Sequence, residues 1–193
     1  DLVSSRGLGD VYKRQTINVK DLETGKMLSD EIKGVNSYTA WSSDSKTFFY
    51  TGKDEETLRS DRIFRHNVGD DQRDDEIVYE EKDETFSTYV YPSKSREYIF
   101  IGSESTLSSE YRYLPSDTPN QEFKILQERE RGLEYRPYHI GDMFYITTNA
   151  GNSTNFKIVK TSVSNTDKSN WEDVIQHSDD ILLSLIHISE PTR

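Results

Sequence analysis

Short runs of aromatic and β-branched residues recur along the chain, and each run follows a turn-forming stretch. The runs cover residues 47–51, 98–101 and 143–147, and the stretches before them are rich in Asp, Ser, Gly and Pro. Turn residues followed by β-branched and aromatic residues predict strands that begin at turns. Because the runs recur at intervals of about 46 to 50 residues, the chain is predicted to contain a structural repeat.

Other short apolar stretches accompany each run at matching offsets, so each repeat is predicted to contain four strands. A fainter stretch precedes the run, two more follow it, and polar loops separate the last two. This order predicts a four-stranded meander for each repeat. The preceding strands are expected at 37–41, 86–91 and 135–140, the first following strands at 62–68, 110–114 and 155–163, and the second at 76–81, 122–127 and 171–177.

The polarity of these strands predicts how each sheet is covered. Residues 98–101 and 143–146 are apolar on both faces, which indicates burial on both sides. The strands at 110–114 and 155–159 partly alternate, so we expect them to be less enclosed. A sheet that is covered near one edge and wetter toward the other is a propeller blade. The predicted fold class is therefore all-β, a partial β-propeller.

The repeats account for about three four-stranded blades plus parts of two more, and propellers close with roughly four to eight blades. Residues 16–28 are expected to end an earlier blade, and 180–182 to start a later one. The stretch 121–133 is charged enough for a solvated helix. Its position matches the outer strand of the repeat, which favours a strand that runs into a charged loop. The Gly-His and Trp-Asp signature of WD40 repeats is absent.

The two ends of the chain differ in character from the repeats. Residues 1–15 follow neither a helical nor a strand period, and 183–193 are equally unlike the rest. Both resemble translated sequencing adapters, and such segments are set aside before the fold is considered. We therefore expect a partial propeller domain over 16–182 between two non-native stretches. This exclusion also removes His187 and the Gly-Leu-Gly at 7–9 from the candidate sites.

Composition and charge exclude several classes of protein. The chain has 193 residues, with 24 Lys and Arg against 35 Asp and Glu, and a formal net charge of -11. The acidic balance argues against a nucleic-acid partner, whose phosphates require clustered Lys and Arg. No apolar run is long enough for a membrane-spanning helix. The chain has no cysteine, which excludes disulfides, thiolate metal sites and a cysteine nucleophile. Hydrophobic residues make up only 32%, but 12 Tyr and 8 Phe supply large rings for a core.

The residues with catalytic potential form no recognisable site. A serine nucleophile on a strained turn needs Gly-x-Ser-x-Gly, and the nearest stretch, 151–155, lacks the last glycine. We interpret it as a loop between two strands. His66, His139 and His177 have no partner at a metal-ligand spacing, so we expect them to serve packing or to lie on the surface.

The acidic clusters are expected to be solvated loops. The cluster at 70–76 lacks the central glycine and the closing glutamate of a calcium loop, and another pair stands at 80–81. Asp44 and Asp142 are expected to cap turns. Asn152 begins a formal glycosylation sequon, which has meaning only in a secreted protein. The sequence therefore predicts no catalytic, cofactor-binding or metal-binding residue.

Many dispersed stretches resemble oligopeptidase B, a branch of the prolyl oligopeptidase family of serine peptidases. The resemblance extends over essentially all of 16–182 and agrees with the repeat, because that family has a seven-bladed propeller. The stretches are VKDLETGKMLSDEI (19–32), WSSDSKTFFYT (41–51), RIFRHNVG (62–69), VYEEKDETF (78–86), SKSREYIFIGSESTLSSEYRYL (93–114) and ERERGLEYRPYHIGD (128–142).

The resemblance implies a peptidase that cuts short peptides after Lys or Arg, in the cytoplasm or, alternatively, the periplasm. Its Ser-Asp-His triad would belong to a C-terminal α/β-hydrolase domain, and the propeller would gate access to that site. Its partners would be short basic peptides and its own hydrolase domain, without a cofactor, nucleic acid or membrane. Because the triad lies outside this stretch, we expect the 193-residue chain to be inactive alone.

A propeller that serves only as a binding scaffold is the alternative, because propellers host both functions. The gene beyond this stretch distinguishes the two. A Gly-x-Ser-x-Gly followed by Asp and then His would indicate the enzyme, whereas a stop codon soon after the propeller closes would indicate the scaffold. The acidic surface would also attract cationic peptides at low salt.

Overall fold

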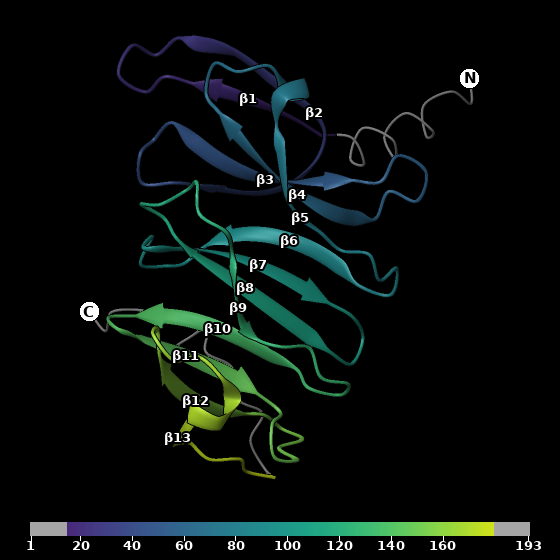
Figure 1. Ribbon diagram of the computed structural model, residues 1–193, viewed down its shortest axis with the longest axis vertical. Coiled ribbons are helices and arrows are strands. Elements are labelled where there is room, and N and C mark those ends of the chain that lie inside the picture. Colours follow the sequence, from purple (N-terminus) through teal and green to yellow (C-terminus); the bar gives the residue numbers. More distant parts are fainter. Residues whose placement is uncertain (1–14, 180–193) are drawn as a thin grey trace, which may run out of the picture.

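The computed structural model describes residues 15–179, whose strands form three antiparallel sheets stacked one after another (Figure 1). The predictions for 180–182 and for the two ends, except Gln15, lie outside the described residues. The first sheet contains β1 (Gln15–Lys20), β2 (Met27–Trp41), β3 (Thr47–Lys53), β4 (Ser60–Asn67) and β5 (Glu76–Glu80). The second sheet contains β6 (Ser87–Pro92), β7 (Tyr98–Glu104), β8 (Ser109–Pro115) and β9 (Lys124–Gln127). The third sheet contains β10 (Tyr135–Ile140), β11 (Met143–Thr148), β12 (Lys157–Ser162) and β13 (Glu172–Ile175).

Each sheet is a meander in which neighbours in sequence are neighbours in space, as predicted. Short 3-10 turns, η1 (Gln72–Asp74) and η2 (Lys168–Asn170), precede the last strands of the first and third sheets. The stretch 121–133 forms β9 and then a loop, which confirms the interpretation against a helix. No helix in the described part of the chain is long and apolar enough to cross a membrane.

Turn chemistry fixes where the hairpins begin. The Asp44 carboxylate accepts hydrogen bonds from the backbone N–H groups of Lys46 and Thr47, each at 2.8 Å, which confirms the predicted cap. Asp142 lies in the two-residue turn between β10 and β11, where Gly141 has φ +64°. There the Asp142 carbonyl, rather than its carboxylate, accepts from the Val163 N–H.

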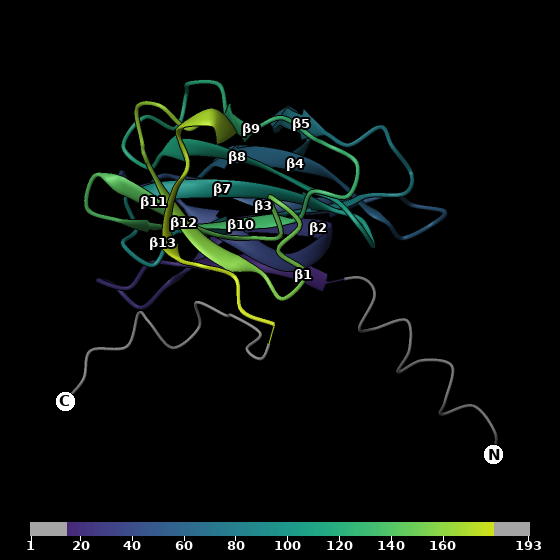
Figure 2. The same cartoon turned by 90° about the horizontal axis from the view of Figure 1, so that it is seen from below.

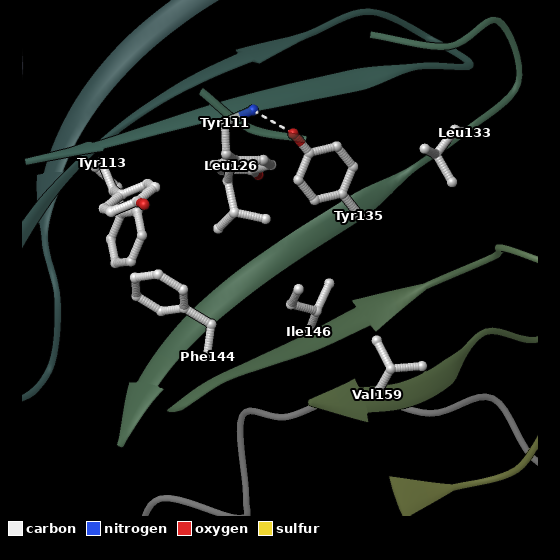
Figure 3. Packing of buried hydrophobic residues seen from close by; sticks show 9 residues of the cluster. Tyr111, Tyr113, Leu126, Leu133, Tyr135, Phe144, Ile146 and Val159 are labelled. Carbon is white, nitrogen blue, oxygen red and sulfur yellow. Dashed lines mark hydrogen bonds between the residues drawn. The ribbon is translucent and has the colours of Figure 1, made fainter. Parts of the chain in front are cut away.

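The sheets are held together by apolar clusters between their faces. Between the second and third sheets, Phe100, Tyr111 and Tyr113 pack against Tyr135 and Phe144 (Figure 3). The Tyr135 hydroxyl crosses this interface and accepts a hydrogen bond from the Tyr111 N–H at 2.8 Å. Full burial of each such ring stabilises the fold by roughly 1.5–3 kcal/mol. The cluster between the first and second sheets comprises Ala40, Phe49, Ile63, Val90, Ile99, Ile101 and Leu114.

Two predictions about enclosure are wrong. β8 is almost wholly buried, although its alternation predicted a wetter strand, because Tyr111 and Tyr113 face the third sheet while Leu114 faces the first. β11 was predicted to be buried on both faces, yet Met143 and Tyr145 are only half-buried. The face of β11 that carries them points away from the second sheet, and no other described sheet packs on it.

The N-terminal strands also differ from the prediction, in which residues 16–28 end an earlier, separate blade. β2 is one continuous strand that pairs with β1 along its first half and with β3 along its second half. A register shift between Val35 and Thr39 separates the two pairings. The first sheet therefore has five strands, and the expected fourfold meander begins within β2.

Candidate functional site

The first strand of each four-stranded meander lies at the inner edge of its own sheet. β2, β6 and β10 contact the preceding or following sheet, as in the hydrogen bond from Val90 N on β6 to Thr51 Oγ1 on β3 (3.2 Å). The last strands β5 and β13 are instead mostly exposed. Figure 2 shows β5 and β9 together at one edge and β2 near the opposite edge. Because propeller blades surround a central channel, the first strands are the ones that line it.

Three residues occupy equivalent positions on these first strands. Ala40 pairs with Phe49 in the first sheet, Tyr91 with Phe100 in the second, and Tyr138 with Tyr145 in the third. These three pairs occupy the same place in each meander, so they align the sheets with one another. Two residues earlier on the same face stand Tyr38, Tyr89 and Arg136. We call these three residues the channel row. Tyr38 is 48% exposed, and its ring lies 5.4 Å from that of Tyr89 on the next sheet.

A carboxylate anchors the middle of the channel row. Glu104 Oε1 accepts hydrogen bonds from the Tyr89 hydroxyl at 2.6 Å and from the Tyr111 hydroxyl. Burial, followed by the charge of Glu104, raises the pKa of Tyr89. The same causes, together with the neighbouring tyrosines, raise the pKa of Tyr111, so both hydroxyls remain protonated donors. A Cβ at Gly102 would lie 2.8 Å from the Tyr89 ring, so the close approach requires glycine here.

Arg136 is the third residue of the channel row, and its guanidinium lies near an aromatic ring. Its guanidinium carbon lies 5.8 Å from the centroid of the Tyr91 ring, within the range of a cation–π contact. Among residues 15–179 no Asp or Glu lies within ion-pair distance of it, although Arg62, Arg65 and Arg129 all have such partners. The channel row therefore carries two tyrosine rings and one cation, and Glu104 lies near its middle.

His66 lies away from the channel row, buried between two carboxylates. Its Nε2 is 3.0 Å from Asp30 Oδ1 and its Nδ1 is 2.7 Å from Asp75 Oδ1, while the Tyr50 hydroxyl donates to Asp75 Oδ2 at 2.8 Å. Burial alone would lower the pKa of His66, but the hydrogen bonds and charges of Asp30 and Asp75 outweigh burial and raise it. In the described part of the chain this cluster is not arranged to hold a metal ion.

This arrangement confirms the packing interpretation of His66 and corrects that of the acidic clusters. Asp75 was predicted to lie in a solvated loop, but its side chain is 2% exposed, and burial raises its pKa. Glu81 was likewise predicted to be solvated, yet it is buried and pairs with Arg129 at 2.5 Å. In each case the carboxylate has a partner outside its own acidic cluster: His66, nine residues away, for Asp75, and Arg129, 48 residues away, for Glu81.

The contacts of the remaining candidate residues are structural. His139 is buried and contacts Ser95 Oγ at 2.8 Å, and His177 lies 3.4 Å from Thr154 Oγ1 in an exposed contact. The loop 151–155 connects β11 to β12, and the buried Ser153 hydroxyl donates to the Ala150 carbonyl at 3.0 Å rather than toward a histidine. Asn152 is exposed in this loop with φ +61°.

Comparison with known proteins decides the family. The model of the prolyl oligopeptidase N-terminal β-propeller domain matches residues 11–191. The chain belongs to the prolyl oligopeptidase family. The matched model describes the N-terminal propeller of that family, which confirms the predicted fold and the resemblance.

Relatives and solved structures agree with this assignment. Dipeptidyl aminopeptidase BI of Pseudoxanthomonas mexicana is 40% identical over 171 residues, which cover 89% of this chain and 24% of the relative. Protease 2 of Moraxella lacunata is 34% identical over 173 residues, again 89% and 24%. The oligopeptidase B structure from Leishmania major superimposes with a TM-score of 0.82 and 29% identity, over 90% of this chain and 24% of that one. The chain thus spans about a quarter of the length of these relatives.

The sequence contained a signal for the channel row that residue-type motifs do not detect. Tyr38, Tyr89 and Arg136 follow one another at the repeat interval, so aligning the repeats would have placed them on one row. That Glu104 lies beside two tyrosine hydroxyls depends on the hairpin register of this propeller, which the repeat alone does not specify.

Proposed function

We propose that this propeller segment is part of a serine oligopeptidase that hydrolyses short peptides after Lys or Arg. The propeller, over residues 16–182, would gate access to a catalytic α/β-hydrolase domain in the full-length protein. The observation that carries the proposal is the channel row. Large side chains occupy the three equivalent inner positions, and they would narrow a channel that the closed propeller forms. Family membership and the peptidase names of the relatives support the reaction class.

The contribution of this segment to the reaction is exclusion and alignment. In a Ser-His-Asp triad, His acts as the general base and Asp orients it, and neither step needs a cofactor. This chain has no Gly-x-Ser-x-Gly motif, and we expect the chain alone to be inactive. A propeller that admits one extended peptide and keeps out folded proteins acts by orientation and by restricting access. Such a peptidase would work in the cytoplasm, with the periplasm as the alternative.

The preference for basic residues is consistent with the charge of this segment. The net charge of -11 and the Glu104 carboxylate near the channel row would attract cationic peptides, most strongly at low salt. The side-chain preference itself would be set mainly in the hydrolase domain.

The test uses the full-length peptidase that contains this segment. Chromogenic peptides ending in Arg, Lys, Ala or Pro at the scissile bond report side-chain preference, and we expect kcat/KM to be highest for Arg and Lys. Substituting Tyr38→Ala should widen the passage and raise the rate on a long unfolded substrate relative to a dipeptide substrate. Ile77→Ala is the matched control, because Ile77 is 48% exposed on the outer strand β5.

Two results would count against the proposal. Equal kcat/KM for all four side chains would reject the basic preference. An unchanged ratio of long to short substrates in Tyr38→Ala would reject gating at the channel row. A full-length protein that hydrolyses none of these peptides would instead indicate a binding scaffold.

A further inference from the structure

Two carboxylates enclose the buried imidazole of His66. Its Nε2 lies 3.0 Å from Asp30 Oδ1 and its Nδ1 lies 2.7 Å from Asp75 Oδ1, and all three side chains are almost fully buried. An ionised carboxylate only accepts hydrogen bonds, so both contacts are hydrogen bonds only when both ring nitrogens carry a hydrogen. The geometry therefore fits the protonated imidazole, and loss of its proton would leave one buried carboxylate facing a nitrogen lone pair.

The two carboxylates belong to different parts of the first sheet. Asp30 lies in the segment 15–35, in which β1 pairs with the first half of β2, and we call this segment the N-terminal hairpin. The hairpin lies at the end of the stack and packs its apolar side chains on β3 (Figure 1). Asp75 lies in the loop between β4 and β5, and His66 lies near the end of β4. His66 therefore connects the N-terminal hairpin to the rest of the sheet.

The other contacts across this junction do not involve the imidazole proton. The Gln72 side chain accepts a hydrogen bond from the Lys33 N–H and donates one to the Lys33 carbonyl, each at 2.9 Å. The Gly69 N–H donates to Asp30 Oδ1 at 2.6 Å. The apolar part of the junction comprises Val19, Ile32, Val35, Phe48 and Tyr50. Loss of the His66 proton would therefore act on one contact and leave the others unchanged.

The titratable groups that surround His66 do not replace its charge. The Tyr50 hydroxyl on β3 donates to Asp75 Oδ2 at 2.8 Å, and burial, followed by the contact with Asp75, raises the pKa of Tyr50. Burial raises the pKa of Asp75, and the charge of Asp70 in the same loop acts in the same direction. Among residues 15–179, Asp30 and Asp75 form their ion pairs with His66. With a neutral imidazole, two buried carboxylates would share one ring N–H.

We propose that His66 is a proton-operated latch between the N-terminal hairpin and the rest of the first sheet. With the proton in place, the imidazole holds Asp30 of the hairpin and Asp75 of the loop 68–75 together. Loss of the proton to solvent removes the donor from one carboxylate, and the hairpin separates from β3 and β4. Because the hairpin covers the apolar face of β3, its release opens the propeller wall at this sheet. The latch depends on neither the channel row nor the preference for basic peptides.

Hydrogen–deuterium exchange of the full-length peptidase measures the latch without turnover. Exchange is followed by mass spectrometry from about pH 5.5 to about pH 9 and corrected for the intrinsic pH dependence of amide exchange. Peptides covering 28–35 and 69–75 contain the reporting amides of Lys33 and Gly69. Their protection should fall about tenfold per pH unit between pH 6.5 and the raised pKa of His66, and then level off. β7 and β8 should be more strongly protected at every pH, because they stay closed when the hairpin is released.

Two variants separate the proton from the packing of the junction. In Asp75→Asn the amide N–H can donate to a neutral Nδ1, the amide oxygen still accepts from Tyr50, and the Nε2 hydrogen remains for Asp30. This variant should keep the junction closed and lose most of the pH dependence. Gln72→Ala is the matched control, because it weakens the same junction through a neutral contact. It should lower protection at every pH and keep the slope.

Three results would overturn the proposal. Protection of 28–35 and 69–75 that does not change with pH would show that the His66 proton does not hold the hairpin. Protection equal to that of β7 and β8 at every pH would show that these segments open only with the whole fold. An Asp75→Asn variant with the slope of the unsubstituted protein would assign the pH dependence to another group. The first two results are measured on the unsubstituted protein and do not depend on the stability of a variant.

Discussion

Replacing Arg129 by Met should destabilise the fold more than any other surface arginine substitution in this segment. Arg129 follows β9 and reaches back to the first sheet, where its guanidinium pairs with Glu81 at 2.5 Å and covers the Phe86 ring at 3.6 Å. Its own N–H donates to Glu110 at 3.0 Å, and this backbone bond would survive the substitution. The substitution therefore removes the cation and leaves the chain path in place.

The magnitude follows from the burial of the carboxylate that is left behind. Glu81 is 4% exposed and would lose its cation, which typically costs about 3–5 kcal/mol for a fully buried pair. Glu81 keeps hydrogen bonds from the Tyr79 hydroxyl at 2.8 Å and from the Asp83 N–H at 3.0 Å, and the Arg129 side chain is 26% exposed. These two facts reduce the expected loss to roughly 2–3 kcal/mol.

The assay is urea unfolding followed by the fluorescence of Trp41 and Trp171. With a slope of about 2 kcal/mol per molar urea, the midpoint should fall by about 1–1.5 M. The double variant Arg129→Met with Glu81→Gln removes the stranded charge and should recover part of the loss. Loss of stability that is simply the sum of the two single variants would refute the idea that the stranded charge, rather than lost packing, causes the effect.

Three further outcomes are expected. The free energy of unfolding should fall as the pH rises above 6.5 and through the raised pKa of His66, because protonated His66 stabilises the fold below that range. Melting curves recorded over a range of pH should show a flatter pH dependence for the His66→Asn variant. Gly102→Ala should cost roughly 1–3 kcal/mol, because its methyl group would lie 2.9 Å from the Tyr111 ring, whereas Ser87→Ala on β6 should change the urea midpoint little. Phe144→Ala, at a ring that is 0% exposed between two sheets, should cost about 3–5 kcal/mol in the same titration, and a loss below about 1 kcal/mol would show that the sheets are not coupled there.

The repeat was predictable because every blade has the same types of residue at the same places along its strands and turns. Turn residues before 98–101 and 143–147 specify where a hairpin begins, and alternation specifies which face is apolar. Enclosure was less predictable, since it depends on the neighbouring sheet rather than on the strand itself. β8 reads as a half-exposed strand in sequence and is buried because it lies between two other sheets.

Polar partners were not predictable for a related reason. His66 lies 36 residues from Asp30, and Arg129 lies 48 residues from Glu81. Glu81 stands in a stretch whose local composition is typical of a solvated loop, and only the packing of the second sheet on the first brings Arg129 close to it. A single chain carries no local signal for such pairs, so charge clusters are poor guides to exposure in a fold built of stacked sheets.

The channel row illustrates what a repeat can still predict once its register is known. Tyr38 and Tyr89 are equivalent and contact each other across two sheets, so the third equivalent position should also carry a ring if the row served only to pack the blades. Arg136 stands there instead, and Tyr91 provides the aromatic contact. The repeat therefore predicts which strand position faces the neighbouring blade, but not the residue type that occupies it.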